Sequence, residues 1–119
     1  MTALAERILL VDADRYICFG LKGALESFHS VTVALSDEEA LHQARHKPFD
    51  LAIVDYRLRN MDGISLAKNL RLVQPSLRVI LMTAYDSPIV KEEAIGQGFY
   101  YLVKPFSTHA LLQLIEELR

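Results

Sequence analysis

Short apolar segments of strand length recur along the chain at regular intervals. They are Ile8–Val11, Val31–Leu35, Leu51–Val54, Val79–Met82 and Phe99–Val103. The first, third and fourth segments are almost continuously apolar, which is typical of strands that are covered on both faces. The pattern therefore predicts five β-strands in a sheet that helices cover.

Helical periodicity follows each of these segments. After the first segment, the positions with helical spacing are Tyr16, Phe19, Gly20, Gly23, Ala24 and Phe28. After the third segment they are Ile64, Leu66, Ala67, Leu70 and Val73. After the fifth they are Leu111, Leu112, Ile115 and Leu118. Helix-start signals accompany the patterns. Ser36 and Glu39 form a capping box, Ser87 precedes Pro88, and Ser107 precedes the last pattern. Five helices are therefore expected, one after each strand.

Strict alternation of strands and helices indicates parallel strands joined by right-handed crossovers. The expected fold class is α/β, a three-layer doubly wound sandwich of five βα units. The 119 residues suffice for one domain with a buried core, and the chain contains no internal repeat or linker. We therefore expect residues 1–119 to form one domain, with any further domain beyond residue 119.

The composition is that of a globular protein and narrows the function classes. Hydrophobic residues make up 51%, charged residues 24%, and the formal net charge is −2. No basic run suggests direct binding to nucleic acid or to an anionic membrane. The sequence has no leader pattern and no apolar run of membrane-spanning length, and its single cysteine, Cys18, cannot form an internal disulfide. These features predict a cytoplasmic location.

Reactive side chains follow four of the five predicted strands. Asp12, Asp55, Thr83 and Lys104 stand at the ends of the first, third, fourth and fifth strands. Ligands of an open parallel sheet bind at the carboxyl ends of its strands, so we expect these side chains to share one site. Each has a plainer explanation alone, such as a solvated turn or a lysine that reaches water. Their coincidence at corresponding positions favours a site.

These residue types together suit phosphoryl transfer to a carboxylate. An aspartate can attack a phosphoryl group and form an aspartyl phosphate. Because nucleophile and substrate are both anionic, a hard cation such as Mg²⁺ and a lysine ammonium would neutralise charge. Asp55 is the best nucleophile candidate, since it ends the most apolar strand and is held rigidly there.

The chain resembles the receiver domains of two-component response regulators over essentially its whole length. The matching motifs are Leu10-Val11-Asp12, Asp50–Leu58, Met61-Asp62-Gly63, Ile80–Tyr85 and Tyr101–Phe106. The resemblance implies a flavodoxin-like sheet with strand order 2-1-3-4-5 and a cis peptide before Pro105. It also implies a phosphoacceptor that is served by a histidine kinase or phosphotransfer protein and is not itself a turnover enzyme.

The resemblance assigns roles to the candidate residues. Asp55 would be the phosphoacceptor, and Thr83 and Lys104 would contact the phosphoryl group. Thr83 and Tyr101 would form the switch that relays phosphorylation to the face made by the fourth helix, fifth strand and fifth helix. Tyr100, where an acid is common, should face opposite to Tyr101. That face would serve a homodimer or a C-terminal output domain of the DNA-binding, transcription-regulating kind.

The same resemblance implies that Asp12, Asp55 and the backbone carbonyl of Arg57 hold Mg²⁺. The chain departs from the family pattern here, because Ala13 replaces the usual second acid. Asp14 lies one residue later, where the side chain of an extended chain faces the other way. We expect Asp14 chiefly to cap the following helix, with contact to the metal through water as the other option. Weakened Mg²⁺ binding is the expected consequence.

Other functions fit parts of the pattern. A haloacid-dehalogenase-like phosphatase also begins with a strand ending in Asp-x-Asp, but it needs an acidic pair on a loop after the lysine. Only Glu116 and Glu117 follow Lys104, within a helix. A phosphorylation-independent receiver that acts as an interaction module stays open, because one metal ligand is lost. A dinucleotide site would need a glycine motif after the first strand. Four histidines are too scattered for a zinc site, namely His29, His42, His46 and His109.

Overall fold

The computed structural model describes residues 5–119, and strands and helices alternate throughout them. The strands are β1 (Arg7–Val11), β2 (Ser30–Ala34), β3 (Leu51–Asp55), β4 (Arg78–Thr83) and β5 (Tyr100–Val103). The helices are α1 (Arg15–Leu25), α2 (Asp37–His46), α3 (Gly63–Val73), α4 (Pro88–Gly96) and α5 (Thr108–Glu117). The predicted alternation is confirmed. Residues 1–4, which the domain prediction included, lie outside the described residues.

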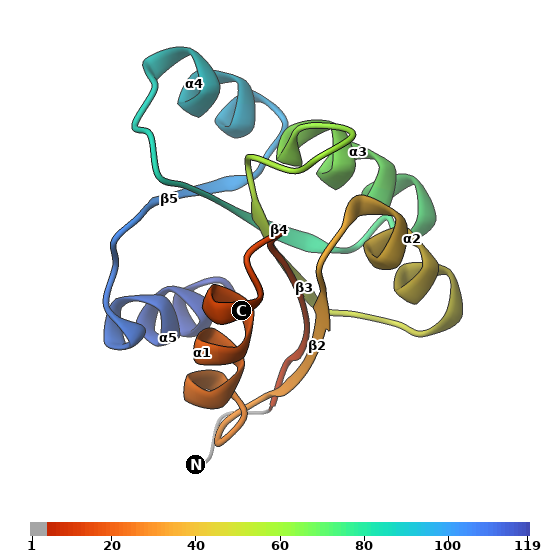
Figure 1. Cartoon of the computed structure of the whole chain (residues 1–119), viewed down its shortest axis with the longest axis vertical. Helices are drawn as coiled ribbons and strands as arrows, with labels where there is room; N and C mark the ends of the chain where they lie inside the picture. Colours follow the sequence, from red (N-terminus) through yellow and green to blue (C-terminus); the bar gives the residue numbers. More distant parts are fainter. Residues whose placement is uncertain (1–4) are drawn as a thin grey trace.

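All five strands are parallel and lie in the order β2-β1-β3-β4-β5, as the resemblance implied. Helices α1 and α5 cover one face of the sheet, and α2, α3 and α4 cover the other (Figure 1). The three-layer α/β prediction is therefore confirmed. Because the strands are parallel, all five carboxyl ends lie on one edge of the sheet, here called the carboxyl edge, and all amino ends lie on the opposite, amino edge.

The central strands are buried on both faces, as their continuous apolar character predicted. Leu9 and Val11 of β1 pack toward α2, α3 and α4, whereas Ile8 and Leu10 pack toward α1 and α5. Every side chain in Leu51–Val54 of β3 is also fully buried. Burying each large apolar side chain contributes about 1.5–3 kcal/mol, so the ends of these strands are held firmly. Among residues 5–119, no helix has the length and apolar character needed to span a membrane.

The apolar stripe predicted for α1 largely faces solvent instead of the sheet. Tyr16, Phe19 and Phe28 are 85%, 56% and 61% exposed, whereas Cys18 and Leu25 are fully buried. Both sets of positions have helical spacing, so periodicity alone allowed either face to be the buried one. Packing against α5 and the sheet selects the face, and the sequence prediction of this stripe is wrong for that reason.

Polar side chains begin the five helices, four of them at the expected positions and Asp62 without having been predicted. Asp14, Ser36, Asp62, Ser87 and Ser107 each accept a hydrogen bond from a backbone N–H in the first turn of α1, α2, α3, α4 and α5 respectively. Such caps satisfy amide groups that a helix leaves unpaired, and each contributes about 1 kcal/mol. Each loop leaves the carboxyl end of a strand and ends at one of these caps. The caps therefore help to define the carboxyl edge.

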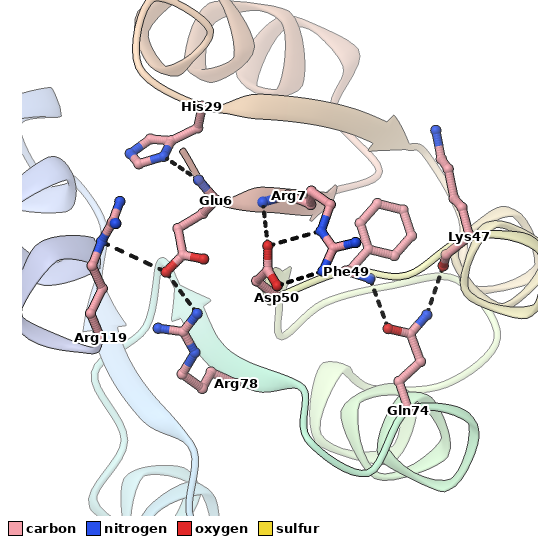
Figure 2. A network of polar contacts seen from close by, with 9 residues as sticks. All are labelled: Glu6, Arg7, His29, Lys47, Phe49, Asp50, Gln74, Arg78 and Arg119. Carbon is pink, nitrogen blue, oxygen red and sulfur yellow. Dashed lines mark hydrogen bonds and ion pairs between the residues drawn. The ribbon is translucent and has the colours of Figure 1, made fainter. Parts of the chain in front are cut away.

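Charged side chains close the amino edge of the sheet (Figure 2). Glu6 is 7% exposed, and its carboxylate lies 2.7 Å from Arg78 Nη2 and 3.8 Å from Arg119 Nε. The backbone N–H of Glu6 donates to Nδ1 of the buried His29 at 3.0 Å. Arg78 also donates to the carbonyl of Leu118 at 2.7 Å. These contacts join β1, β4 and the end of α5.

A second pair at the same edge joins β1 to the residue before β3. Arg7 donates to Asp50 through its backbone N–H at 2.8 Å, through Nε at 3.1 Å and through Nη2 at 2.9 Å. The hydrogen bonds from the Arg7 side chain lower the pKa of Asp50 to about 2. The two groups of contacts together are called the amino-edge network below, made of Glu6, Arg7, His29, Asp50, Arg78 and Arg119.

Candidate functional site

Four of the predicted site residues meet at the carboxyl edge. Asp12 directly follows β1, and Asp55 is the last residue of the neighbouring strand β3. Thr83 is the last residue of β4, which lies beside β3. Lys104 follows β5, and its backbone N–H donates to the carbonyl of Thr83 at 2.7 Å. Asp12, Asp55 and Thr83 are only 3%, 8% and 2% exposed. Parallel strands of matched register thus bring residues from four segments of the sequence into one buried site, here called the carboxyl-edge site.

Lys104 connects the two buried acids. Its Nζ lies 2.9 Å from Asp12 Oδ2 and 2.8 Å from Asp55 Oδ1. The other oxygens accept backbone hydrogen bonds, Asp12 Oδ1 from Asp14 at 2.9 Å and Asp55 Oδ2 from Arg57 at 3.2 Å. Each of the four carboxylate oxygens therefore has a donor. Two of these oxygens, Asp12 Oδ1 and Asp55 Oδ2, have no contact with Lys104, and each oxygen keeps a further lone pair that a cation could use.

The electrostatics of the site leave Asp55 poorly stabilised as an anion. Burial raises the pKa of Asp55, and the charge of Asp12 acts in the same direction, while the hydrogen bond from Lys104 opposes both. Burial by itself lowers the pKa of Lys104, but its hydrogen bonds to Asp55 and Asp12 outweigh burial and raise it overall. Lys104 is therefore a permanent ammonium, and two carboxylates share one cation.

The donor set fits a hard divalent cation in part. Asp12 and Asp55 present the carboxylate oxygens that Mg²⁺ prefers, and the backbone carbonyl of Arg57 follows two residues after Asp55. Ala13 has no ligand to offer. Asp14 is exposed and uses its Oδ1 to accept from the first turn of α1, as the capping prediction stated. Within residues 5–119, no group of three or more His, Cys, Asp or Glu side chains is placed to hold a metal ion.

The predicted switch residues are linked through the loop between β4 and α4. Thr83 Oγ1 accepts from the backbone N–H of Tyr85 and donates to its carbonyl, both at 3.1 Å. The half-buried Tyr101 places its hydroxyl in the same loop, where it accepts from the N–H of Ser87 at 3.0 Å and lies 3.3 Å from Asp86 Oδ1. The loop that precedes α4 is thus held both by Thr83 of the site and by Tyr101 of β5.

Two neighbours of the site, Tyr85 and Gly63, had received no role from the sequence, and Arg57 had received one only for its backbone carbonyl. The side chains of Arg57 and Tyr85 contact each other, with the guanidinium carbon 4.4 Å from the ring centroid. Gly63 begins α3 so close to β3 that a Cβ there would collide with the carbonyl oxygen of Asp55. Gly63 and Tyr85 both belong to recognised motifs, which was the one available signal. The peptide bond between Lys104 and Pro105 is cis, as expected.

The flavodoxin-like sheet, with two acids and a lysine at its carboxyl edge, defines the class of CheY-like α/β domains. A family model described as the response regulator receiver domain matches residues 8–116. The chain belongs to this family and is the receiver domain of a two-component response regulator. This membership removes the phosphatase alternative. Mg²⁺ binding at an acidic pocket is a general feature of the family.

Relatives with curated descriptions support the same conclusion. The chain is 36% identical over 112 residues to the transcriptional regulatory protein ZraR of Salmonella typhimurium, and 39% identical over 114 residues to the response regulator protein FleR of Pseudomonas aeruginosa. The matches cover 92% and 94% of this chain but only 25% and 24% of the relatives. The chain thus spans about a quarter of the length of these relatives.

Solved structures share the fold closely. A CheY-like receiver domain protein of Methanospirillum hungatei matches with a TM-score of 0.89 at 30% identity, covering 95% of this chain and 92% of that one. A response regulator protein of Burkholderia pseudomallei, described with a phosphorylated aspartic acid and a calcium ion, matches with a TM-score of 0.84 at 30% identity, covering 90% of this chain and 64% of that one.

Proposed function

We propose that Asp55 accepts a phosphoryl group from a histidine kinase or a phosphotransfer protein. The observation that carries this proposal is the lysine that joins two buried acids at the carboxyl edge, with Nζ within 2.9 Å of Asp12 and Asp55. A carboxylate oxygen of Asp55 would attack phosphorus while the bond from phosphorus to the donor breaks. Lys104 would then offset the charge of the new phosphoryl oxygens, and the domain would act as acceptor, not as a turnover enzyme.

We infer that Mg²⁺ supports this transfer but binds more weakly than in a site with three acids. Asp12, Asp55 and the carbonyl of Arg57 would hold it, and it would offset charge on the transferring phosphoryl group. Mg²⁺ readily retains several waters. A water can therefore fill the coordination position for which Ala13 offers no side-chain ligand. The ammonium of Lys104, which contacts both acids, would repel the incoming cation and so weaken its binding.

We propose that phosphorylation is relayed through the loop between β4 and α4. Thr83 Oγ1 can reach a phosphoryl oxygen only by giving up one or both of its bonds to the backbone of Tyr85. The Tyr85 carbonyl also lies 3.4 Å from the Tyr101 hydroxyl, which in turn holds the N–H of Ser87 at the start of α4. A shift of Thr83 would therefore favour a second position of Tyr101 and of this loop, as a change in population between two states.

The output surface in this proposal is the face of α4, β5 and α5. Ile89 and Ile95 of α4 and Tyr100 of β5 are 78%, 57% and 43% exposed, which gives this face an apolar character suited to a second copy or an output domain. Since relatives are named transcriptional regulatory proteins, we propose a C-terminal DNA-binding output domain in the full protein. The receiver itself would not bind nucleic acid. Its cytoplasmic location stays a prediction.

A second candidate function is phosphate-independent docking. The observation in its favour is that Ala13 has no metal-ligating side chain while Lys104 already contacts both acids. Exposure to acetyl phosphate and Mg²⁺ decides between the two, because a phosphoryl group adds about 80 Da to the mass of the chain. We expect this adduct in the natural chain and not in Asp55→Asn. An undiminished adduct in that variant would move the nucleophile elsewhere, and no adduct in the natural chain would favour docking.

A further inference from the structure

The C-terminal half of α2 carries two histidines on one exposed face of the helix. His42 and His46 are four residues apart, so their side chains lie next to each other on consecutive turns. Their ring centroids are 4.3 Å apart, and both residues are exposed. The sequence pattern treated the histidines of the chain as scattered, but these two are in direct contact in the folded domain.

One of the two rings is already oriented as a metal ligand would be. His46 Nδ1 lies 2.7 Å from the carbonyl oxygen of His42, and a carbonyl oxygen can only accept, so Nδ1 carries a proton. The lone pair of the neutral His46 ring is therefore on Nε2. Histidines that bind metals usually donate their other ring N–H to a carbonyl or carboxylate, because this bond fixes the tautomer and the orientation of the ring.

The position of the pair in the helix also favours a positive ion. His46 is the last residue of α2, and the C-terminal carbonyls of a helix form the negative end of its dipole. The exposed Glu38 stands one turn before His42 and lines the same groove. The exposed Arg45 in the last turn acts against a cation. Binding at this face must therefore depend on coordination bonds and not on charge alone.

We propose that His42 and His46 chelate a late first-row transition-metal dication, of the class of Ni²⁺, Cu²⁺ and Zn²⁺. Imidazole nitrogens suit these ions, whereas Mg²⁺ prefers oxygen ligands. Two histidines at the same spacing on one helix face supply two of the zinc ligands in the metalloprotease motif His-Glu-x-x-His. Water fills the remaining positions of the ion here, because two side chains are fewer than the three or four that catalytic and structural zinc sites use.

This chelate is separate from the carboxyl-edge site. Helix α2 leaves the carboxyl end of β2 and ends before β3 begins at the amino edge, so its last turn lies toward the amino edge. The helix packs on α3 and β2, on the face of the sheet opposite α1 and α5 (Figure 1). The domain thus offers two cation sites of different chemistry, one of carboxylates for a hard ion and one of imidazoles. The second site does not depend on phosphorylation of Asp55.

Calorimetric titration of Ni²⁺ into the tag-free chain, with excess Mg²⁺ present throughout, tests the chelate. His42→Ala and His46→Ala should each weaken the affinity for Ni²⁺ about tenfold or more, because one imidazole alone cannot chelate. Ni²⁺ should also raise the midpoint of thermal unfolding of the natural chain in a concentration-dependent way, and should raise it less in either variant. Both effects should disappear at about pH 5, where protons replace the metal on the imidazoles.

Two matched controls separate the geometry of the pair from the mere number of histidines. His109→Ala removes an exposed histidine from α5 and should leave the affinity for Ni²⁺ unchanged. Gln43→His combined with His46→Ala keeps the number of histidines. It places the second one about 100° around the helix from His42, so it should not restore binding.

Each other result decides against the chelate. Natural affinity for Ni²⁺ in either single alanine variant, or in Gln43→His combined with His46→Ala, would overturn it. A loss in His109→Ala as large as that in His46→Ala would mean that any exposed histidine contributes equally, and the pair would have no special role. A natural chain that binds no Ni²⁺ would also end the proposal. None of these results bears on Asp55, because its phosphoryl adduct is measured separately.

Discussion

The two edges of the sheet both hold buried acids beside basic side chains, but in opposite proportions. At the amino edge, the Glu6 carboxylate has two cations, Arg78 and Arg119, at 2.7 and 3.8 Å. The single negative charge of Glu6 therefore faces two positive charges. The Arg78 side chain also donates a hydrogen bond to the carbonyl of Leu118. Such an arrangement satisfies the charges and ties three elements together, so its natural effect is stability of the fold.

At the carboxyl edge the proportion is reversed, because Asp12 and Asp55 share the single ammonium of Lys104. Two buried negative charges face one positive charge there, and burial, with a smaller effect of the Asp12 charge, raises the pKa of Asp55. A buried charge without compensation destabilises a fold, so it persists where a ligand or reaction uses it. The comparison therefore contrasts a compensated ion network with an uncompensated one, and the second pattern favours the proposed reactive role of Asp55.

The largest expected effect is that a substitution at one edge abolishes phosphorylation, whereas a substitution at the other edge lowers stability. Asp55→Asn should abolish the phosphoryl adduct while leaving the free energy of unfolding unchanged or higher by about 1 kcal/mol, because it removes a poorly compensated charge. Glu6→Gln should lower the free energy of unfolding by about 2 kcal/mol, since the partly exposed Arg78 and Arg119 lose their charged partner, yet preserve the adduct. Urea unfolding and intact mass measure the two quantities. The comparison breaks if Glu6→Gln loses the adduct while folded, or if Asp55→Asn unfolds the domain.

The next effect concerns the missing acid. Ala13→Asp should raise Mg²⁺ affinity roughly ten- to a hundredfold, because a charged ligand contributes on the order of 1–3 kcal/mol. Asp14→Asn should change the affinity little, because Asn caps a helix about as well as Asp. Calorimetric titration of Mg²⁺ into the three chains measures this. Should Asp14→Asn abolish binding while Ala13→Asp gains nothing, then Asp14 is the ligand in place of the lost acid.

The amino edge should also dominate the acid sensitivity of the fold. The pKa of Asp50 is about 2 in the folded chain against an ordinary 3.8, so the folded state holds the proton less tightly. Its contribution is present above about pH 4 and is lost as the pH falls toward about 2. Solvent screening reduces this contribution to about 1 kcal/mol.

Asp50→Asn tests the acid sensitivity directly. The variant should be less stable than the natural chain by about 1 kcal/mol at pH 6, and the difference should vanish near pH 2. Urea unfolding at a series of pH values measures it. A difference that is constant across the series would show that Asp50 acts through packing and not through its charge.

The smallest expected effect compares two backbone amides that donate to side chains. The N–H of Ser87 donates to the Tyr101 hydroxyl at 3.0 Å, and the N–H of Glu6 donates to His29 Nδ1 at the same distance. Tyr101→Phe removes one acceptor and should speed hydrogen exchange at Ser87 about fivefold, for a bond of about 1 kcal/mol. Exchange at Glu6 should not change. Equal acceleration at both amides would mean that the substitution loosens the whole domain.

Much of the fold and site could be predicted from local patterns. Continuous apolar runs identified β1, β3 and β4, and alternation with helices implied a parallel sheet. A parallel sheet gathers every strand's carboxyl end at one edge. The positions of Asp12, Asp55, Thr83 and Lys104 after their strands were therefore enough to predict that they meet. Serine and aspartate caps were equally predictable, because a cap bonds to amides only two or three residues away.

Contacts between distant residues were decided only by the tertiary structure. Glu6 and Arg78 are 72 residues apart, and no pattern in the chain pairs them. Periodicity likewise left two faces of α1 open, and packing chose Cys18 and Leu25 over the aromatic stripe. Arg57 and Tyr85 contact each other because β3 and β4 are neighbours in the sheet. The sequence by itself determined the order of elements and the edge at which the acids meet, because both follow from local periodicity. Which side chains pair with one another depends on the spatial order and register of the strands, which only the folded chain has.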